Sequence, residues 1–302
     1  MLAIIKNRKI TFILSGILVL ASALALFRFG LKPGIDFTGG SLLEVKFSQE
    51  RPDIADARAT LFAADVGEVL AQTSGPDTML LRMRFLTEDE HQKILSLLRD
   101  SYGPEGETAP SVLEERFETI GPAISANLKD RAAYAAGAVV LAMIIYIAYA
   151  FRKVSKPVES WKYGVAAIIA LLHDVVITMG AFSLLGYFAG VEVGIPFVVA
   201  LLTIMGYSVN DTIVVFDRVR ENLIKRGSDD FAETVNLGVN QSIIRSINMS
   251  LTTLLVLFAL FFFGGESIHY FSLALIIGIA VGTYSSIFLA SPLLVVWARF
   301  KK

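Results

Sequence analysis

Six runs of apolar residues, each long enough to cross a lipid bilayer, constrain this chain more than any other feature. They cover residues 10–27, 132–151, 163–187, 195–216, 246–264 and 271–297. A helix rises 1.5 Å per residue, so about 20 residues cross a hydrocarbon core of about 30 Å. The high content of hydrophobic residues, 54%, agrees with this interpretation. We therefore predict an α-helical multispanning membrane protein with six transmembrane helices.

The first run has an alternative interpretation as a signal peptide. Lys6, Arg8 and Lys9 precede it, and Ala21-Ser22-Ala23 has the small-residue pattern of a cleavage site. The apolar stretch is longer than the core of a typical signal peptide, which has about 7 to 15 residues. We therefore interpret the run as a membrane span.

Lysine and arginine are distributed unevenly between the runs. Three precede the first run, four lie in 152–162, five in 217–246 and three at the C-terminus, whereas 188–194 and 265–270 contain none. Because cytoplasmic loops are rich in Lys and Arg, this pattern predicts that both termini are cytoplasmic. The chain then divides into a first span at 1–29, an extracytoplasmic domain at 30–131 and the remaining spans at 132–302.

The segment 30–131 has the pattern of a soluble α+β domain. Alternating apolar residues predict strands, and two longer stretches between them predict helices. Thr87-Glu88-Asp89-Glu90 has the sequence of a capping box at the start of the second helix. The order βαββαβ is that of a ferredoxin-like fold. The strands are expected at 41–47, 66–73, 79–85 and 112–119, and the helices at 52–64 and 87–102.

Composition excludes several functional classes. There is no cysteine, which rules out disulfides and thiolate metal sites, and the three histidines are far apart in the sequence. The segment 30–131 carries eleven Lys and Arg against eighteen Asp and Glu. Nucleic acid is therefore not an expected partner, because its phosphates require a basic surface. The acidic surface is most simply explained by solvation.

Two carboxylates lie within apolar runs. Asp211 follows Asn210 in the fourth run, and Asp174 follows His173 near the middle of the third. A charged side chain at the centre of a bilayer costs about 2.5 to 3.5 kcal/mol on insertion scales, so such residues usually mark an ion or proton path. Hydrogen bonding between helices is the structural alternative for both acids.

Other polar positions occur in the fourth and fifth runs. In the fourth run, a stripe at helical spacing can face other helices, and Gly206 within it permits close packing. The stripe comprises Thr203, Gly206, Asn210 and Asp217. Arg245 lies where the fifth run begins. Its side chain either extends to the membrane interface or pairs with a buried carboxylate.

A carboxylate that alternates between pairing with arginine and binding a proton can couple proton passage to helix movement. A proton gradient is therefore the expected energy source, with no cofactor and no metal. The sequence lacks Walker motifs, HExxH, GxSxG and the GxGD pattern of intramembrane aspartyl proteases. We accordingly predict that the chain is not an enzyme.

A glycine-rich motif, Gly34-Ile35-Asp36-Phe37-Thr38-Gly39-Gly40, follows the first run. It lacks the Lys-Ser/Thr pair of a phosphate-binding loop. The residues alone predict a tight turn in which Asp36 and Thr38 cap backbone groups, and in which Gly39 and Gly40 allow unusual backbone angles.

Five stretches together resemble the bacterial SecF family of membrane proteins, the partners of SecD. They are GIDFTGG at 34–40, ETIGPAIS at 118–125, LHDVVITMG at 172–180, GYSVNDTIVVFDRVREN at 206–222 and QSIIRSINMSLTTL at 241–254. They cover nearly the whole chain in the order of the family. GYSVNDTIVVFDRVREN is highly specific, whereas GIDFTGG is shared with SecD.

The resemblance implies half of a transporter of the resistance-nodulation-division type in the bacterial plasma membrane. In this family SecD and SecF use the proton-motive force to assist protein export, after the Sec channel and its ATPase have begun translocation. The implied partners are SecD, the Sec channel with its ATPase, an unfolded polypeptide in transit and the lipid bilayer.

The resemblance also implies roles for individual residues. Asp211 becomes the carboxylate of the proton path. Arg245 becomes its arginine neighbour across helices, or else serves an Asp contributed by SecD. Asn210 and Asp174 are also expected on this path, while Asp36 and Gly39-Gly40 take a structural or domain-moving role. Asp174 lies in a motif similar to that of the family without being marked as essential. Two alternatives remain open: a proton-coupled exporter of small molecules or lipids, and a scaffold that transports nothing.

Overall fold

The structure is a computed structural model that describes residues 2–48, 51–62, 67, 69–73, 75–102, 112–151, 159–226 and 230–299. Contacts divide the chain into two compact units. The sheet unit is Pro33–Ala132, and the helical unit consists of Met1–Lys32 and Ala133–Lys302. Each unit is described by itself.

The sheet unit contains one antiparallel sheet with the strand order β2-β3-β1-β4. Its elements agree with the predicted order, although the second strand is described only from Leu70. The strands are β1 Gly40–Phe47, β2 Leu70–Thr73, β3 Thr78–Met83 and β4 Val112–Ile120, and the helices are α2 Ile35–Thr38, α3 Ile54–Phe62 and α4 Glu88–Tyr102.

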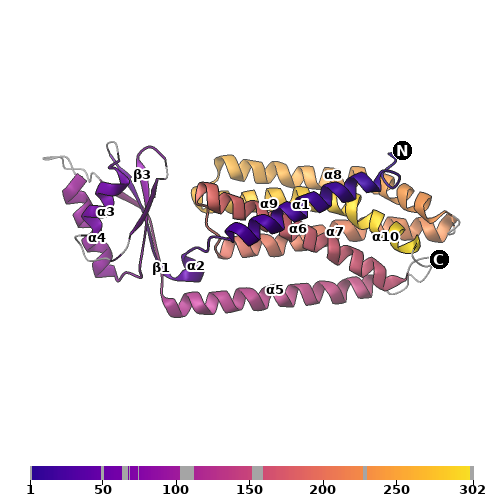
Figure 1. Cartoon of the computed structure of the whole chain (residues 1–302), viewed down its shortest axis with the longest axis horizontal. Coiled ribbons are helices and arrows are strands. Elements are labelled where there is room, and N and C mark those ends of the chain that lie inside the picture. Colours follow the sequence, from indigo (N-terminus) through magenta and orange to yellow (C-terminus); the bar gives the residue numbers. More distant parts are fainter. Residues whose placement is uncertain are drawn as a thin grey trace. The chain divides into compact units, whose positions relative to one another are not determined.

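Alternation along β1 determines which side of the sheet meets the helices (Figure 1). Leu43, Val45 and Phe47 are buried and belong to one hydrophobic cluster with Ile94 and Leu98 of α4. Successive strand residues point to opposite faces, so these three side chains share a face. Burying that face against the amphipathic α4 is the main source of stability in this unit.

The predicted capping box at the start of α4 is confirmed. The Thr87 amide donates to Glu90 Oε2 at 2.8 Å, and the Glu90 amide donates to Thr87 Oγ1 at 3.4 Å. Arg84 adds a salt bridge to Glu90 Oε1 at 2.5 Å. The Arg84 bond and the Thr87 bonds together lower the pKa of Glu90 to about 2.

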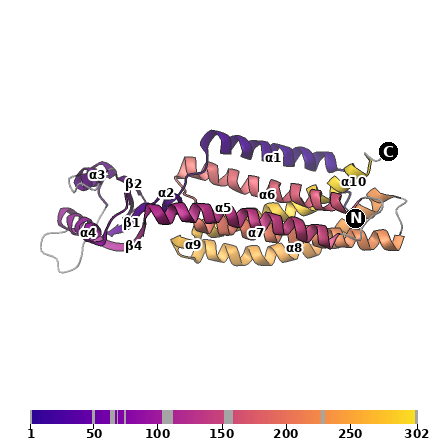
Figure 2. The same ribbon diagram turned by 90° about the horizontal axis from the view of Figure 1, so that it is seen from below.

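The helical unit contains six helices that are long and apolar enough to cross a membrane, as predicted. Its elements are α1 Arg8–Phe29, α5 Pro122–Ala150, α6 Ser160–Ala189, α7 Ile195–Arg226, α8 Phe231–Phe263, α9 Glu266–Ser285, the π-helical turn η1 Ser286–Ala290 and α10 Ser291–Arg299. In both views α1 runs beside α6, and the start of α1 lies at the same end of the unit as α10 (Figures 1 and 2).

Helices α7 and α8 continue beyond the apolar runs that predicted them. The charges of the extension are paired along α7, with Arg218 and Lys225 each bonded to Glu221 at 2.6 Å. Across the two helices, Asn222 donates to Gln241 at 2.9 Å. Helix α7 is therefore longer than its apolar run, because i,i+3 and i,i+4 ion pairs maintain a helix where apolar residues end.

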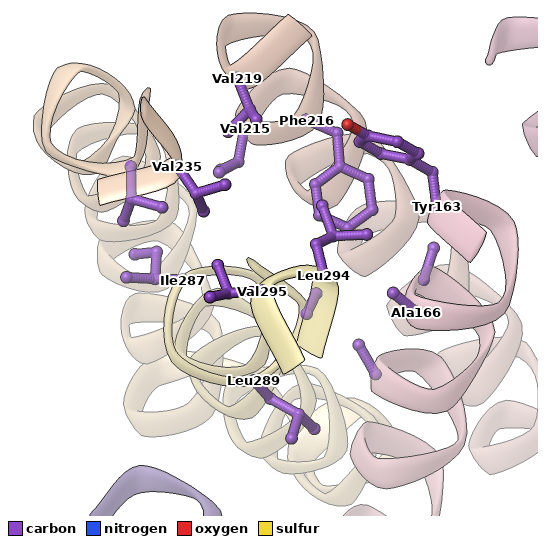
Figure 3. Packing of buried hydrophobic residues seen from close by; sticks show 14 of the residues in the cluster. Tyr163, Ala166, Val215, Phe216, Val219, Val235, Ile287, Leu289, Leu294 and Val295 are labelled. Carbon is purple, nitrogen blue, oxygen red and sulfur yellow. The ribbon is translucent and has the colours of Figure 1, made fainter. Parts of the chain in front are cut away.

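A hydrophobic cluster joins α6, α7, α8, η1 and α10 at the end of the unit where α7 leaves the apolar run. The Tyr163 and Phe216 rings meet edge to face at 5.4 Å. Figure 3 shows Leu294 of α10 beside them, with Val219 and Val235 in the same cluster. These contacts fix the rotation of α7 about its axis, and therefore the direction in which its polar residues point.

The contact between α1 and α6 depends on a glycine. A Cβ atom at Gly180 would lie 2.6 Å from Ser22 Cα on α1, which is closer than side-chain carbons approach a backbone. The two helices can pack at this separation only because position 180 has no side chain.

We therefore expect Gly180→Ala to lower the thermal unfolding midpoint of the detergent-solubilised chain, at a cost of about 1 to 3 kcal/mol for overpacking. Gly137→Ala is the matched control, because a Cβ there would meet no atom within 4 Å. An equal midpoint in the two variants would contradict a tight α1–α6 contact at this glycine.

The capping box makes a second prediction, on pH. Because the pKa of Glu90 is lowered to about 2 from 4.5, its contribution to stability is present above pH 4.5 and is lost as the pH falls toward 2. We expect Glu90→Gln to reduce the loss of stability over this pH window. The measurement is the thermal midpoint of the full chain at a series of pH values. Equal losses in the parent and the variant would show that the box does not act through the Glu90 charge.

Candidate functional site

Asp211 is a residue of α7, and its side chain is buried inside the helical unit against α8. It is 5% exposed, and its Oδ1 accepts a hydrogen bond from Ser246 Oγ on α8 at 2.5 Å. Its Oδ2 is also buried and accepts no close hydrogen bond from the residues that the structure describes, although the Ser286 hydroxyl of η1 is near enough to interact with the carboxylate. A buried carboxylate with one free oxygen can bind a proton without breaking its existing bond.

Asn210 and Arg245 adjoin this bonded pair in sequence, and both are exposed. Among the residues that the structure describes, Arg245 makes no salt bridge and so does not form the expected pair with Asp211. Ser246, the next residue on α8, is hydrogen-bonded to Asp211 instead. Neighbouring helical residues point about 100° apart, since a turn contains 3.6 residues. When Ser246 faces α7, Arg245 must therefore point elsewhere.

The predicted stripe on α7 faces outward rather than toward another helix of this chain. Thr203, Gly206, Asn210 and Asp217 are all exposed, and a Cβ at Gly206 would meet no described atom within 4 Å. The Thr203 hydroxyl bonds back to the Val199 carbonyl at 2.8 Å. The close packing expected at Gly206 is therefore not made within the described chain.

Asp174 has different surroundings, in the middle of α6. It is 1% exposed and accepts three hydrogen bonds. Ser208 of α7 and Ser285 of α9 donate to its Oδ2 at 2.5 and 2.8 Å, and His173 Nδ1 lies 2.9 Å from its Oδ1. The hydroxyl donors come from two other helices, so Asp174 connects three elements of the bundle.

Further hydrogen-bonded hydroxyl groups join α7 to η1 and α8 to α9. Thr212 and Ser286 share a hydrogen bond of 2.9 Å between α7 and η1, and Ser250 on α8 shares one with Thr283 on α9. Sequence reasoning did not select these residues. A detectable signal was the repeat of serine at 242, 246 and 250, because the spacing of four places them on one face of α8.

The glycine-rich motif forms a junction in the sheet unit. Residues 35–38 are one turn of helix rather than the predicted tight turn. As predicted, the Thr38 hydroxyl caps backbone groups, donating to the Gly34 carbonyl at 3.0 Å and lying 3.1 Å from the Gly39 carbonyl. Asp36 is half-buried in this turn.

Gly39 and Gly40 follow with φ angles of 72° and 119°, which L side chains rarely adopt. A Cβ at Gly40 would lie 2.6 Å from the Met83 carbonyl oxygen, and one at Gly39 would lie 3.2 Å from Ser125 Oγ. The pair therefore lets β1 approach the end of β3 and the start of α5.

Comparison with known proteins gives two family matches. Residues 105–300 match the C-terminal part of the protein export membrane proteins SecD and SecF, and residues 24–50 match the SecD/SecF GG motif. A protein translocase subunit SecF from Thermobaculum terrenum is 40% identical over 98% of this chain and 94% of its own length. One from Desulfurispirillum indicum is 42% identical over 94% of this chain and 87% of its own length.

This chain belongs to the SecF family. A crystal structure of SecDF from Thermus thermophilus, described as a translocon-associated membrane protein, agrees with its fold at a TM-score of 0.83 and 33% identity. The match covers 99% of this chain and 39% of the SecDF chain. This chain therefore spans well under half of the SecDF chain that it matches, and the match to the GG motif includes the Gly39-Gly40 junction.

Proposed function

We propose that this chain is an accessory subunit of the Sec protein translocase in the bacterial plasma membrane. With SecD, it uses the proton-motive force to promote protein translocation. Its relatives are named as protein translocase subunits SecF, which supports a role in protein export. The single observation that carries the proton-driven mechanism is the buried Asp211 with one unpaired oxygen.

The geometry around Asp211 suggests how a partner could control it. Ser246 holds one carboxylate oxygen on the inside, while Arg245, the next residue on α8, is exposed. In this proposal Arg245 contacts groups contributed by SecD. Protonation of Asp211 removes a negative charge and so weakens the electrostatic attraction between the carboxylate and the Arg245 guanidinium. An arginine is suited to this exchange because it stays charged in proteins.

SecD is the proposed occupant of the open surfaces of α7 and α8. Gly206 offers a site for close helix packing that this chain leaves unused, and exposed Asn210 and Thr203 can form hydrogen bonds to another helix. Six spans form half of a two-repeat transporter, which also favours a second six-span half. The wider partners in this proposal are the Sec channel with its ATPase, and an unfolded polypeptide.

The topology completes the proposal. Residues 30–131 form the extracytoplasmic domain, and both termini are cytoplasmic, in accord with the distribution of Lys and Arg. The strand order β2-β3-β1-β4 supports a ferredoxin-like fold for that domain. The proton gradient supplies the energy, and no cofactor is part of the mechanism.

Asp211→Asn should abolish the stimulation of export by a proton gradient, because an amide side chain does not take up and release a proton at the pH of the assay. The measurement is protein translocation into inverted vesicles that contain the chain with SecD, at matched expression and complex assembly. We expect the variant to retain gradient-independent translocation. If the variant assembles well and keeps full gradient stimulation, the proton-binding role of Asp211 is contradicted and the scaffold alternative remains.

The natural absence of cysteine makes the proposed SecD surface directly testable. We expect Arg245→Cys to react with a membrane-permeant maleimide in the isolated chain and to be protected when SecD is present. Phe262→Cys, at an exposed position nearly five turns along the same helix and one residue before its end, should label in both states as the control. Labelling of Arg245→Cys that SecD does not change would exclude this surface.

A further inference from the structure

His173 and Asp174 form a buried pair that the proposed mechanism at Asp211 does not use. His173 is 5% exposed, and its Nδ1 lies 2.9 Å from Asp174 Oδ1. The pair lies about 20 Å along α6 from its start, since a helix rises about 1.5 Å per residue. It is therefore far from the end of the helix and deep in an apolar run.

The hydrogen bonds around Asp174 involve both of its carboxyl oxygens. Ser208 and Ser285 donate to one oxygen, and the other oxygen faces the imidazole. With Asp174 ionised, His173 Nδ1 donates to Oδ1; with Asp174 neutral, its own proton is donated to Nδ1. In either form one proton lies on this bond. The Ser285 hydroxyl has a further acceptor in the Gly282 carbonyl.

The second ring nitrogen of His173 is where a proton can bind. Its Nε2 is buried without a hydrogen-bond partner among the described residues. Bonding to Asp174 places the first proton on Nδ1, as a carboxylate partner does for an imidazole. With Nε2 unprotonated, the pair carries one negative charge in an apolar bundle. One proton on Nε2 makes it a neutral ion pair.

Few ionisable groups surround this pair. The ring of Tyr284 from α9 stacks at 6.2 Å from the imidazole, but its hydroxyl already donates to the Thr11 carbonyl and accepts from Ser15 of α1. On α7, Asp211 lies one helical turn beyond Ser208. In η1, the hydroxyl of Ser286 is hydrogen-bonded to Thr212 at 2.9 Å rather than to this pair. None of these contacts occupies Nε2.

We propose that His173 and Asp174 form a second proton-binding site in this chain, in which His173 Nε2 takes up and releases the proton. In the uptake step, a proton adds to the Nε2 lone pair and the charge of the pair changes from minus one to zero; release is the reverse. The inference rests on the proposed proton-driven function. It adds a site inside this chain that is distinct from Asp211.

The direct test is a pH titration by ¹⁵N-histidine NMR of the full chain with SecD in liposomes. The chain has three histidines, so His91→Gln, His173→Gln and His269→Gln assign the signals. We expect the His173 signal to change from the neutral to the doubly protonated form as the pH is lowered. In Asp174→Asn it should stay neutral. A His173 that keeps one protonation state throughout would overturn the proposal.

Transport supplies the second measurement. His173→Gln retains an amide that can donate to Asp174 but cannot take up a proton; we expect about tenfold weaker gradient-stimulated export and a flattened pH profile. His269→Gln is the matched control, since His269 lies in α9 and bonds to the Phe261 carbonyl at 3.0 Å. We expect His269→Gln to leave the shape of the pH profile unchanged.

The outcomes separate this site from the proposed function. If Asp211→Asn loses gradient stimulation while an assembled His173→Gln retains the parent's rate and pH profile, the second site is refuted and the proposed function stands. If His269→Gln flattens the profile as His173→Gln does, the effect is not specific to the pair and the second site is refuted. If the parent itself shows no gradient stimulation, the proposed function fails, and the NMR titration alone decides whether His173 binds a proton.

Discussion

The cost of placing a carboxylate in an apolar helix bundle determines much of the helical unit. Two such groups are present, and the structure supplies each with hydroxyl donors from other helices. A buried polar group without a partner costs more than a hydrogen bond contributes, so these serines determine which helices can pack together. Small side chains serve this purpose well, because they allow α7, α8 and α9 to approach closely.

The two acids differ in how completely they are satisfied. Asp174 has donors on both oxygens and lies inside the chain, whereas Asp211 has one donor and an unpaired oxygen. Asp211 also adjoins Asn210, which is exposed. A fully bonded group resists change, while a partly bonded one responds to a proton or to a new neighbour. This contrast fits a division between an internal pair and a carboxylate at a partner surface.

The glycine-rich motif performs a separate, structural task in the sheet unit. Gly40 touches the end of β3, and Gly39 packs near Ser125 at the beginning of α5. Any larger residue would meet both a forbidden backbone angle and a steric contact. The motif therefore fixes how the first strand begins, which explains why glycine occurs twice there without any phosphate-binding chemistry.

Local patterns in the sequence determined the six spans, the order of strands and helices in the sheet unit, the capping box of α4 and the two buried acids. These features depend on residues close in sequence, so periodicity and capping chemistry reveal them. The sequence did not determine that Ser246 rather than Arg245 would bond Asp211, that the α7 stripe would remain open, or that α7 and α8 would extend past their apolar runs. Such contacts depend on the rotation and crossing of helices, which are set by packing between distant residues such as Phe216 and Tyr163, and only the tertiary structure decides them.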